Sequence, residues 1–268
     1  MDGFSKTWLA LREPADHAAR STTLTRVVLD VMADDPSPRI LDLAAGTGSN
    51  LRYLAEQIAD AHWLLVDHDP ALLARVEESP RVETRVMDLA SPEDIDSAIF
   101  DGRTLVTASA LLDLVSEPWL RALAAACARQ GSAVLFALSY DGSVECTPED
   151  HDDAQMIALV NEHQRTDKGF GPALGPGATD AAERGFAAVG YRIERARSEW
   201  ILRPELVELQ RQLLDGWAQA ATGMAPHQAR AIDTWHERRL AHLAAGWSTI
   251  IVGHEDLIGI HGSKNLRT

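Results

Sequence analysis

A short turn rich in small residues constrains the fold of this chain more than any other feature. Residues 39–50 read RILDLAAGTGSN, in which a hydrophobic run breaks into the small residues around Gly46 and Gly48. The following segment, 51–59, carries apolar residues at helical spacing. The pattern predicts a strand, a glycine turn and a helix. Because glycine lacks a side chain, backbone N–H groups and the helix start can approach a ligand closely there. An ordinary strand-to-helix turn is the alternative, and the following strands count against it.

Two further strands are expected to end in acidic residues. The apolar run 62–66 ends at Asp67, which follows Gly48 by 19 residues. This suits the roughly 20-residue spacing of a ribose-binding carboxylate, which accepts hydrogen bonds from both vicinal hydroxyls. Asp69 and Pro70 are better suited to begin a helix over 70–78. A third strand over 82–87 ends at Asp88, whose carboxylate can accept from an exocyclic adenine amine.

The rest of the first half repeats this alternation of strands and helices. A fourth strand starts at 105–107, a helix follows over 117–129, and a wholly apolar fifth strand spans 133–138. Alternating elements predict an α/β fold, with a parallel sheet covered by helices on both faces. Such sheets bind ligands at the carboxyl ends of their strands, where the acids noted above lie.

These motifs resemble those of the class I S-adenosylmethionine-dependent methyltransferases. LDLAAGTGSN is similar to that family's glycine motif, VDHDPALL and VMDLASP to its second- and third-strand motifs, and TASALLDLV to its fourth-strand segment. The resemblance implies a three-layer Rossmann-like fold with a seven-stranded, mostly parallel sheet whose last strand is antiparallel, plus helical additions. The final strands would then span 192–201 and 249–260, after a helix over 179–189.

The resemblance also implies a cofactor, S-adenosyl-L-methionine, with S-adenosyl-L-homocysteine as its product. Ala44 stands where the family usually has its first glycine, so a positive φ there would be strained. An NAD-dependent dehydrogenase is the less favoured alternative, since Leu51 occupies the third glycine position of its motif. A catalytically silent cofactor-binding subunit is a second alternative. The cofactor-binding residues carried over are Asp42, Ala44, Gly46, Gly48, Asn50, Asp67, His68, Asp88, Leu89 and Ser109.

We expect a single methyltransferase domain over 1–268. Residues 4–33 read as one or two helices, of which Trp8 to Arg20 is either a lid or a surface helix. Two apolar stripes predict a helical hairpin over 204–247. One is formed by Leu206, Leu209, Leu213, Trp217 and Ala221, and the other by Ile232, Trp235 or His236, Leu240 and Leu243. The expected parts are an N-terminal helical lid (1–35), a cofactor-binding core (39–140), an acceptor-side insertion (141–178) and the C-terminal half of the sheet with the hairpin (179–268).

The residues on the acceptor side are inferred from their position and residue type. Met156, Val160 and His163 share one helical face, and His163 is the candidate general base, with a satisfied core histidine as the alternative. Tyr140 is a second catalytic candidate. Methyl transfer needs a base only where the attacking atom carries a proton of high pKa. The candidate substrate-binding residues are Trp8, Arg20, Asp113 and Lys168.

Charge and composition limit the partners. The net charge of −15 argues against nucleic acid, whose phosphates require basic contacts. Two cysteines provide neither a disulfide framework nor a zinc pair, which fits a cytoplasmic protein without a metal. No signal peptide or membrane-spanning run is apparent. We therefore expect methyl transfer to a small-molecule acceptor by a monomer or homodimer, with protein N-methylation as the alternative.

Overall fold

Two helices open the chain in the computed structural model, which describes residues 5–58, 60–90 and 97–262. Helix α1 spans Lys6–Ala19 and α2 spans Thr22–Met32, as expected for this segment, although Phe4 lies outside the described residues. Serine caps begin both: Ser5 Oγ accepts from Trp8 N at 3.1 Å, and Ser21 Oγ accepts from Leu24 N at 3.2 Å.

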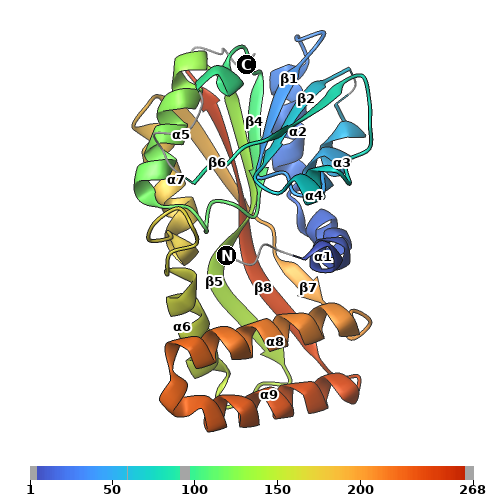
Figure 1. Cartoon of the computed structure of the whole chain (residues 1–268), viewed down its shortest axis with the longest axis vertical. Coiled ribbons are helices and arrows are strands. Elements are labelled where there is room, and N and C mark those ends of the chain that lie inside the picture. Colours follow the sequence, from blue (N-terminus) through green and yellow to red (C-terminus); the bar gives the residue numbers. More distant parts are fainter. Residues whose placement is uncertain (1–4, 59, 91–96, 263–268) are drawn as a thin grey trace.

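A mixed sheet of eight strands forms the centre of the molecule, in the order β3-β2-β1-β4-β5-β8-β6 with β7 paired to β8 (Figure 1). The first five strands are parallel, and β8 runs antiparallel to β5, β6 and β7. This confirms the expected fold class, except that the strand expected over 192–201 is broken into two. The strands are β1 (Arg39–Leu43), β2 (His62–Asp67), β3 (Val82–Val86), β4 (Leu105–Ser109), β5 (Ala133–Thr147), β6 (Tyr191–Arg197), β7 (Trp200–Leu202) and β8 (Thr249–His261).

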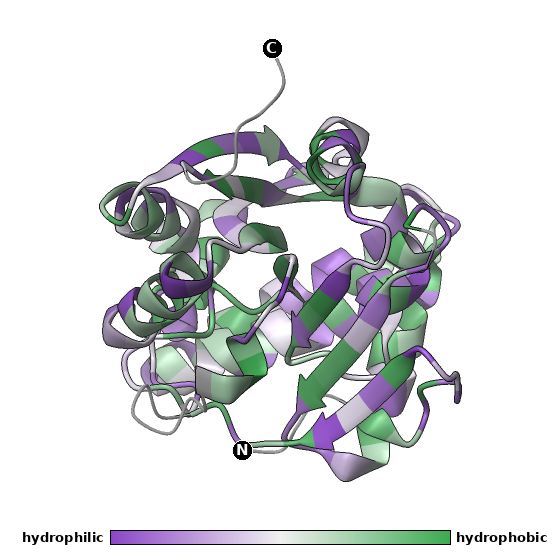
Figure 2. Ribbon diagram, turned by 90° about the horizontal axis from the view of Figure 1, so that it is seen from above, coloured by the Kyte–Doolittle hydropathy of each residue, from purple (hydrophilic) through white to green (hydrophobic). Residues whose placement is uncertain are grey.

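Helices cover both faces of this sheet (Figure 2). Side chains from α5 and α7 form one core cluster with the strands, and side chains from α2 and α3 form another on the opposite face. Helix α4 ends at Leu73 rather than at 78, although Asp69 caps it as expected and accepts from Ala71 N. The remaining helices are α3 (Ser49–Ala55), α4 (Pro70–Leu73), η1 (Ser97–Phe100), α5 (Glu117–Gln130), α6 (Asp153–Gln164), η2 (Gly175–Gly177), α7 (Ala178–Ala187), α8 (Val207–Met224), η3 (Pro226–Gln228) and α9 (Ala229–Ala244).

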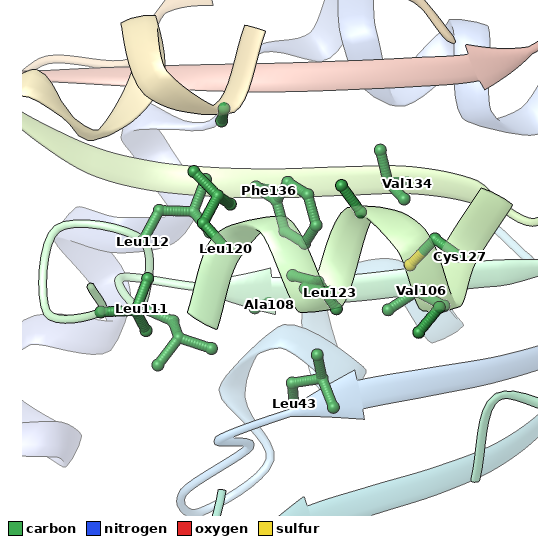
Figure 3. Close-up of a cluster of buried hydrophobic side chains, with 14 of the residues drawn as sticks. Leu43, Val106, Ala108, Leu111, Leu112, Leu120, Leu123, Cys127, Val134 and Phe136 are labelled. Carbon is green, nitrogen blue, oxygen red and sulfur yellow. The ribbon is translucent and has the colours of Figure 1, made fainter. Parts of the chain in front are cut away.

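Packing of α5 against β4 and β5 builds the largest part of the core (Figure 3). Leu123 and Cys127 of α5 lie over Val106 of β4 and Phe136 of β5, and all four are fully buried. Helix α5 has apolar residues at helical spacing, and residues 133–138 of β5 are all apolar. Both patterns are recognisable in the sequence, which explains why both elements could be predicted. This core fixes the carboxyl ends of β4 and β5 relative to β1.

The long strands β5 and β8 continue beyond the ends of the parallel strands and pack with α6, α8 and α9 in a second core (Figure 1). The segment expected as an insertion after Tyr140 therefore begins as strand, and its helix starts at Asp153 rather than near 147. The helical hairpin is present, but its stripe differs. Leu214 is buried while Leu206, which precedes α8, is 37% exposed. Trp235, not His236, fills the core position of α9.

Candidate active site

A cavity of about 250 Å³ lies at the carboxyl ends of β1, β2 and β4, beside α1. The glycine turn after β1 forms its floor, and the residues after β4 form one wall. Helix α1 and the loop after α6 close other sides. The lining residues are Leu9, Arg12, Asp16, Asp42, Ala44, Ala45, Gly46, Thr47, Ser49, Asn50, Asp67, His68, Leu72, Ser109, Ala110, Leu111, Leu114, Lys168 and Phe170.

Asp67 ends β2 and ties that strand to the glycine turn. Its Oδ2 atom accepts a hydrogen bond from Gly46 N at 2.8 Å, and its Oδ1 atom accepts from Asp69 N at 2.9 Å. The side chain is buried yet lines the cavity, next to His68. Backbone donors therefore hold a carboxylate at the mouth of the turn, with lone pairs left to accept from a ligand.

The glycine turn needs left-handed backbone at three positions. The φ angles are 51° at Ala44, 55° at Gly46 and 81° at Gly48. A Cβ atom at Gly48 would also lie 3.2 Å from Val76. Glycine adopts such angles without a steric penalty, whereas alanine does not. The sequence argument that a positive φ at Ala44 would be strained therefore applies to this turn.

A buried polar network lies behind the turn. Asn50 Nδ2 donates to Asp42 Oδ1 at 2.8 Å and to Thr107 Oγ1 at 3.1 Å, while Arg20 Nη1 donates to Asn50 Oδ1 at 2.8 Å. Arg20 Nε also lies 3.6 Å from Asp256 Oδ2. Burial raises the pKa of Asp42 to about 7. Arg20, expected to bind substrate, is buried and does not line the cavity, on which it acts through Asn50 and through its charge near Asp42.

One face of α1, in the segment expected to be either a lid or a surface helix, forms a wall whose lining residues sequence reasoning did not name. Leu9, Arg12 and Asp16 line the cavity at helical spacing. Arg12 and Asp16 form a two-point ion pair at 2.9 and 3.1 Å, and Asp16 Oδ1 also accepts from Trp200 Nε1 at 3.0 Å. Trp8, the residue expected here, packs instead against Trp200. The spacing of these three residues was the available signal.

Only some of the residues expected on the acceptor side line the cavity. Lys168 lines the cavity, whereas Asp113, Tyr140 and His163 do not. Tyr140 is buried and donates to Asn161 Oδ1 at 2.8 Å, and burial raises its pKa. His163 is half-buried, and its Nδ1 atom lies 3.3 Å from Lys168 Nζ. Burial and Lys168 lower the pKa of His163.

The expected adenine-side residues lie just outside the cavity. Asp88 is exposed, and its Oδ1 atom accepts from Ala90 N at 2.9 Å, an ordinary local turn. Leu89 is buried in the core, where its carbonyl accepts from Trp119 Nε1 at 2.5 Å. Gly48 likewise supports the turn without lining the cavity. Ser91 and Pro92, the end of the third-strand motif, lie outside the described residues.

One group with metal-ligand chemistry occurs in the part of the chain that the structure describes. Ligand atoms of Asp150, His151 and Asp152 lie within 4.8 Å of one another. Arg238 donates to both carboxylates, at 2.6 and 2.8 Å to Asp150 and 2.7 Å to Asp152. The one arginine offsets part of their negative charge, and none of the three residues lines the cavity at the glycine turn.

Comparison with known proteins gives one family match and a shared fold. Residues 40–131 match the family model described as a methyltransferase domain. No curated protein matches the chain. Among solved structures, a cyclopropane synthase from Mycobacterium tuberculosis superposes with a TM-score of 0.50 at 13% identity, covering 95% of this chain and 94% of that one.

Two further solved structures are similar at lower TM-scores. A geranyl diphosphate C-methyltransferase from Streptomyces coelicolor A3(2) has a TM-score of 0.49 at 12% identity, with 90% of this chain and 80% of that one covered. A phosphoethanolamine N-methyltransferase from Haemonchus contortus has a TM-score of 0.47 at 13% identity, with coverages of 96% and 58%.

Proposed function

We infer that the protein is a class I S-adenosylmethionine-dependent methyltransferase that methylates a small-molecule acceptor, because residues 40–131 match a methyltransferase domain. The observation that carries this inference is Asp67. Its carboxylate ends β2 inside the cavity, held by the N–H of Gly46 across the glycine turn. A carboxylate in this position is suited to the two hydroxyls of a ribose.

The donor and acceptor groups of the cavity fit S-adenosylmethionine. The Oδ2 atom of Asp42 is buried and lacks a hydrogen-bond partner among the described residues, and Asp42 lines the cavity. It can accept from the ammonium group of the methionine end, while Asp67 accepts from the ribose. Ala44, Gly46, Asn50, His68 and Ser109 complete this half of the site. When bound, the sulfonium supplies an activated methyl group.

The remaining walls align the acceptor and exclude water. Large apolar side chains line the cavity, so much of its lining is apolar. They are Leu9, Leu72, Leu111, Leu114 and Phe170. A displacement at carbon depends on holding the attacking atom in line with the methyl group, and an apolar wall keeps competing water out. We propose that alignment is the main catalytic contribution, because neither His163 nor Tyr140 lines the cavity.

A compact acceptor fits this arrangement better than a polymer. Helix α1 covers the turn so closely that a Cβ at Gly46 would meet Leu9 Cδ1 at 3.5 Å. The net charge of −15 also disfavours a polyanion. A protein side chain remains the second candidate, because a flexible peptide tail can also enter a covered site.

Two free cysteines, Cys127 and Cys146, are both buried. They support the proposal that the enzyme acts in the reducing cytoplasm. None of the helices in the described ranges has the length and apolar character needed to cross a bilayer.

Incubation with methyl-labelled S-adenosylmethionine and either a metabolite extract or total protein tests the acceptor class. We expect label in the low-mass fraction, and an Asp67→Asn enzyme should leave the fraction unlabelled. Label recovered in protein would favour the second candidate. Cofactor binding without any transfer would favour a catalytically silent subunit.

A further inference from the structure

Lys168 differs from every other charged side chain that lines the cavity. Arg12 is paired with Asp16, Asp42 accepts from Asn50, and Asp67 accepts from backbone amides. Within residues 5–58, 60–90 and 97–262, no carboxylate lies within 4.0 Å of Lys168 Nζ. The cavity of an acidic protein therefore contains a cation that lacks an anionic partner.

The contacts of this ammonium leave one donor unused. Lys168 Nζ lies 3.3 Å from His163 Nδ1 and donates to Thr166 Oγ1 at 3.1 Å. An ammonium can only donate, so Nδ1 accepts and the ring proton of neutral His163 sits on Nε2. A lysine ammonium has three N–H groups. The third is left for a ligand in the cavity that Lys168 lines.

The loop that carries Lys168 is well ordered by its own hydrogen bonds. Asp167 Oδ1 accepts from Gly169 N at 2.7 Å and from Gly171 N at 3.0 Å. Phe170, which also lines the cavity, packs edge-on against the buried Trp119 with 5.6 Å between ring centroids. The ammonium is thus held in place before a ligand arrives, which lowers the entropy cost of binding.

Lys168 is partly buried, so the absence of a close carboxylate in the described part of the chain raises the free energy of its charged form. Burial lowers the pKa of Lys168, while the nearby buried Asp113 acts in the opposite direction. The Oδ1 atom of Asp113 has no hydrogen-bond partner among the described residues, yet it lies beyond 4.0 Å from Nζ. A charge removed from water without a close counter-charge is costly, and a bound anion would offset that cost.

We propose that Lys168 binds an anionic group, a carboxylate or a phosphate, of the methyl acceptor. This rests on the proposed function. The acceptor is favoured over the cofactor because Lys168 lies outside the family-matched segment 40–131, on the loop after α6, whereas Asp42, Gly46 and Asp67 come from β1, the turn and β2. The neighbouring Phe170 gives the same ligand an apolar contact.

The charge of the methylated product tests this proposal. Wild-type enzyme, labelled S-adenosylmethionine and a metabolite extract should give a low-mass product that an anion exchanger retains at pH 8. The Lys168→Met enzyme should give at least about tenfold less of it at equal concentration, because a charge-assisted hydrogen bond is lost. Lys168→Arg should retain part of the yield. Lys6→Met, an exposed lysine at the start of α1, is the matched control.

Titration with S-adenosylhomocysteine separates the two possible sources of the anion. We expect the Lys168→Met enzyme to bind it within about twofold of wild type. A large loss would assign Lys168 to the cofactor carboxylate and overturn the proposal, as would a labelled product that the exchanger does not retain. Wild-type protein that does not bind S-adenosylhomocysteine would instead contradict the proposed function.

If the metabolite extract contains no acceptor, the binding of small anions tests the proposal instead. Ligand-detected NMR with acetate and with inorganic phosphate, in the presence of S-adenosylhomocysteine, should show binding to wild type and to Lys6→Met. The signal should be lost in Lys168→Met. The stronger probe identifies the group as carboxylate or phosphate. Equal signals from wild type and Lys168→Met would contradict the assignment.

Discussion

Glu13 on α1 and Arg52 on α3 form a two-point ion pair, with both N–O distances at 2.6 Å. Arg52 Nη1 also donates to the carbonyl of Thr47 in the glycine turn at 2.7 Å. One arginine therefore connects the helix that covers the cavity to the turn that forms its floor. The hydrogen bond from Arg52 lowers the pKa of Glu13.

Replacing Glu13 with glutamine should loosen this connection without unfolding the protein. The pair is partly exposed, with Arg52 at 43% and Glu13 at 20%, so we expect a loss of only about 0.5–1 kcal/mol of stability. The dissociation rate of S-adenosylhomocysteine should rise several-fold, because α1 opens more often. Stopped-flow displacement measures the rate, and Glu117→Gln, in an exposed ion pair on α5, is the control. An unchanged rate would mean that α1 does not gate the site.

Replacing Ala44 with glycine should stabilise the protein. Ala44 has a φ of 51°, which costs a residue with a Cβ atom about 1–2 kcal/mol. Glycine removes that strain but adds roughly 0.4–1 kcal/mol of unfolded-state entropy. The expected net gain is about 0.5–1 kcal/mol in urea denaturation. Ala45→Gly, at a neighbouring position without a positive φ, should destabilise. Destabilisation by both would show that Ala44 is not strained.

The sequence predicted the parallel sheet and the cofactor-side turn well because both depend on local signals. Small residues around Gly46 and Gly48 mark the turn, and an apolar strand that ends in an acid marks Asp67. The acceptor side depends instead on how distant segments pack. Asp16 lines the cavity while it accepts a hydrogen bond from Trp200, far along the chain. The helical spacing of Arg12 and Asp16 was the local signal, and a surface helix can show the same spacing.

The same limit explains the displaced acceptor candidates. Tyr140 was expected at the end of a short strand, but β5 continues to Thr147 and carries it into the second core. Arg20 was expected to bind substrate, whereas it is 5% exposed and bound to Asn50. Burial of long polar side chains depends on partners from other elements, which a single sequence does not reveal.

The contribution of Asp42 to stability should fall as pH rises from about 4 to about 7. Burial raises the pKa of Asp42 from an ordinary 3.8 to about 7, so the folded protein keeps a proton that the unfolded chain releases. The contribution is fully present below pH 4 and is lost as pH passes 7, at most about 4 kcal/mol. Asp42→Asn keeps the acceptor for Asn50 and removes this contribution, so the ligand-free variant should lose less stability than wild type as pH rises through this range in urea denaturation.

Asp113, whose pKa burial raises to about 6, contributes a smaller fall over this range, and the buried His254, whose pKa burial lowers to about 4, contributes a rise. The exposed Asp233→Asn substitution is the control and should follow wild type. An Asp42→Asn profile parallel to wild type would show that Asp42 stays ionised throughout this range.

Replacing His163 with alanine should impair turnover more than cofactor binding. His163 accepts from Lys168, so its removal frees the ammonium to move and should raise the acceptor KM several-fold. S-adenosylhomocysteine affinity should stay within about twofold. His163→Asn, which offers a carbonyl acceptor, should recover part of the loss. A fall in kcat alone, with KM unchanged and no recovery by asparagine, would favour the general-base role.

Calorimetric titration with S-adenosylhomocysteine tests the central claim most directly. We predict 1:1 binding to wild type. Asp67→Asn should weaken it by about 2–3 kcal/mol, because the amide NH2 replaces an acceptor oxygen that a ribose hydroxyl needs. The exposed Asp233→Asn should bind as wild type does. Absence of binding by folded wild type up to millimolar ligand, or equal affinity in Asp67→Asn, would contradict the assignment of this cavity.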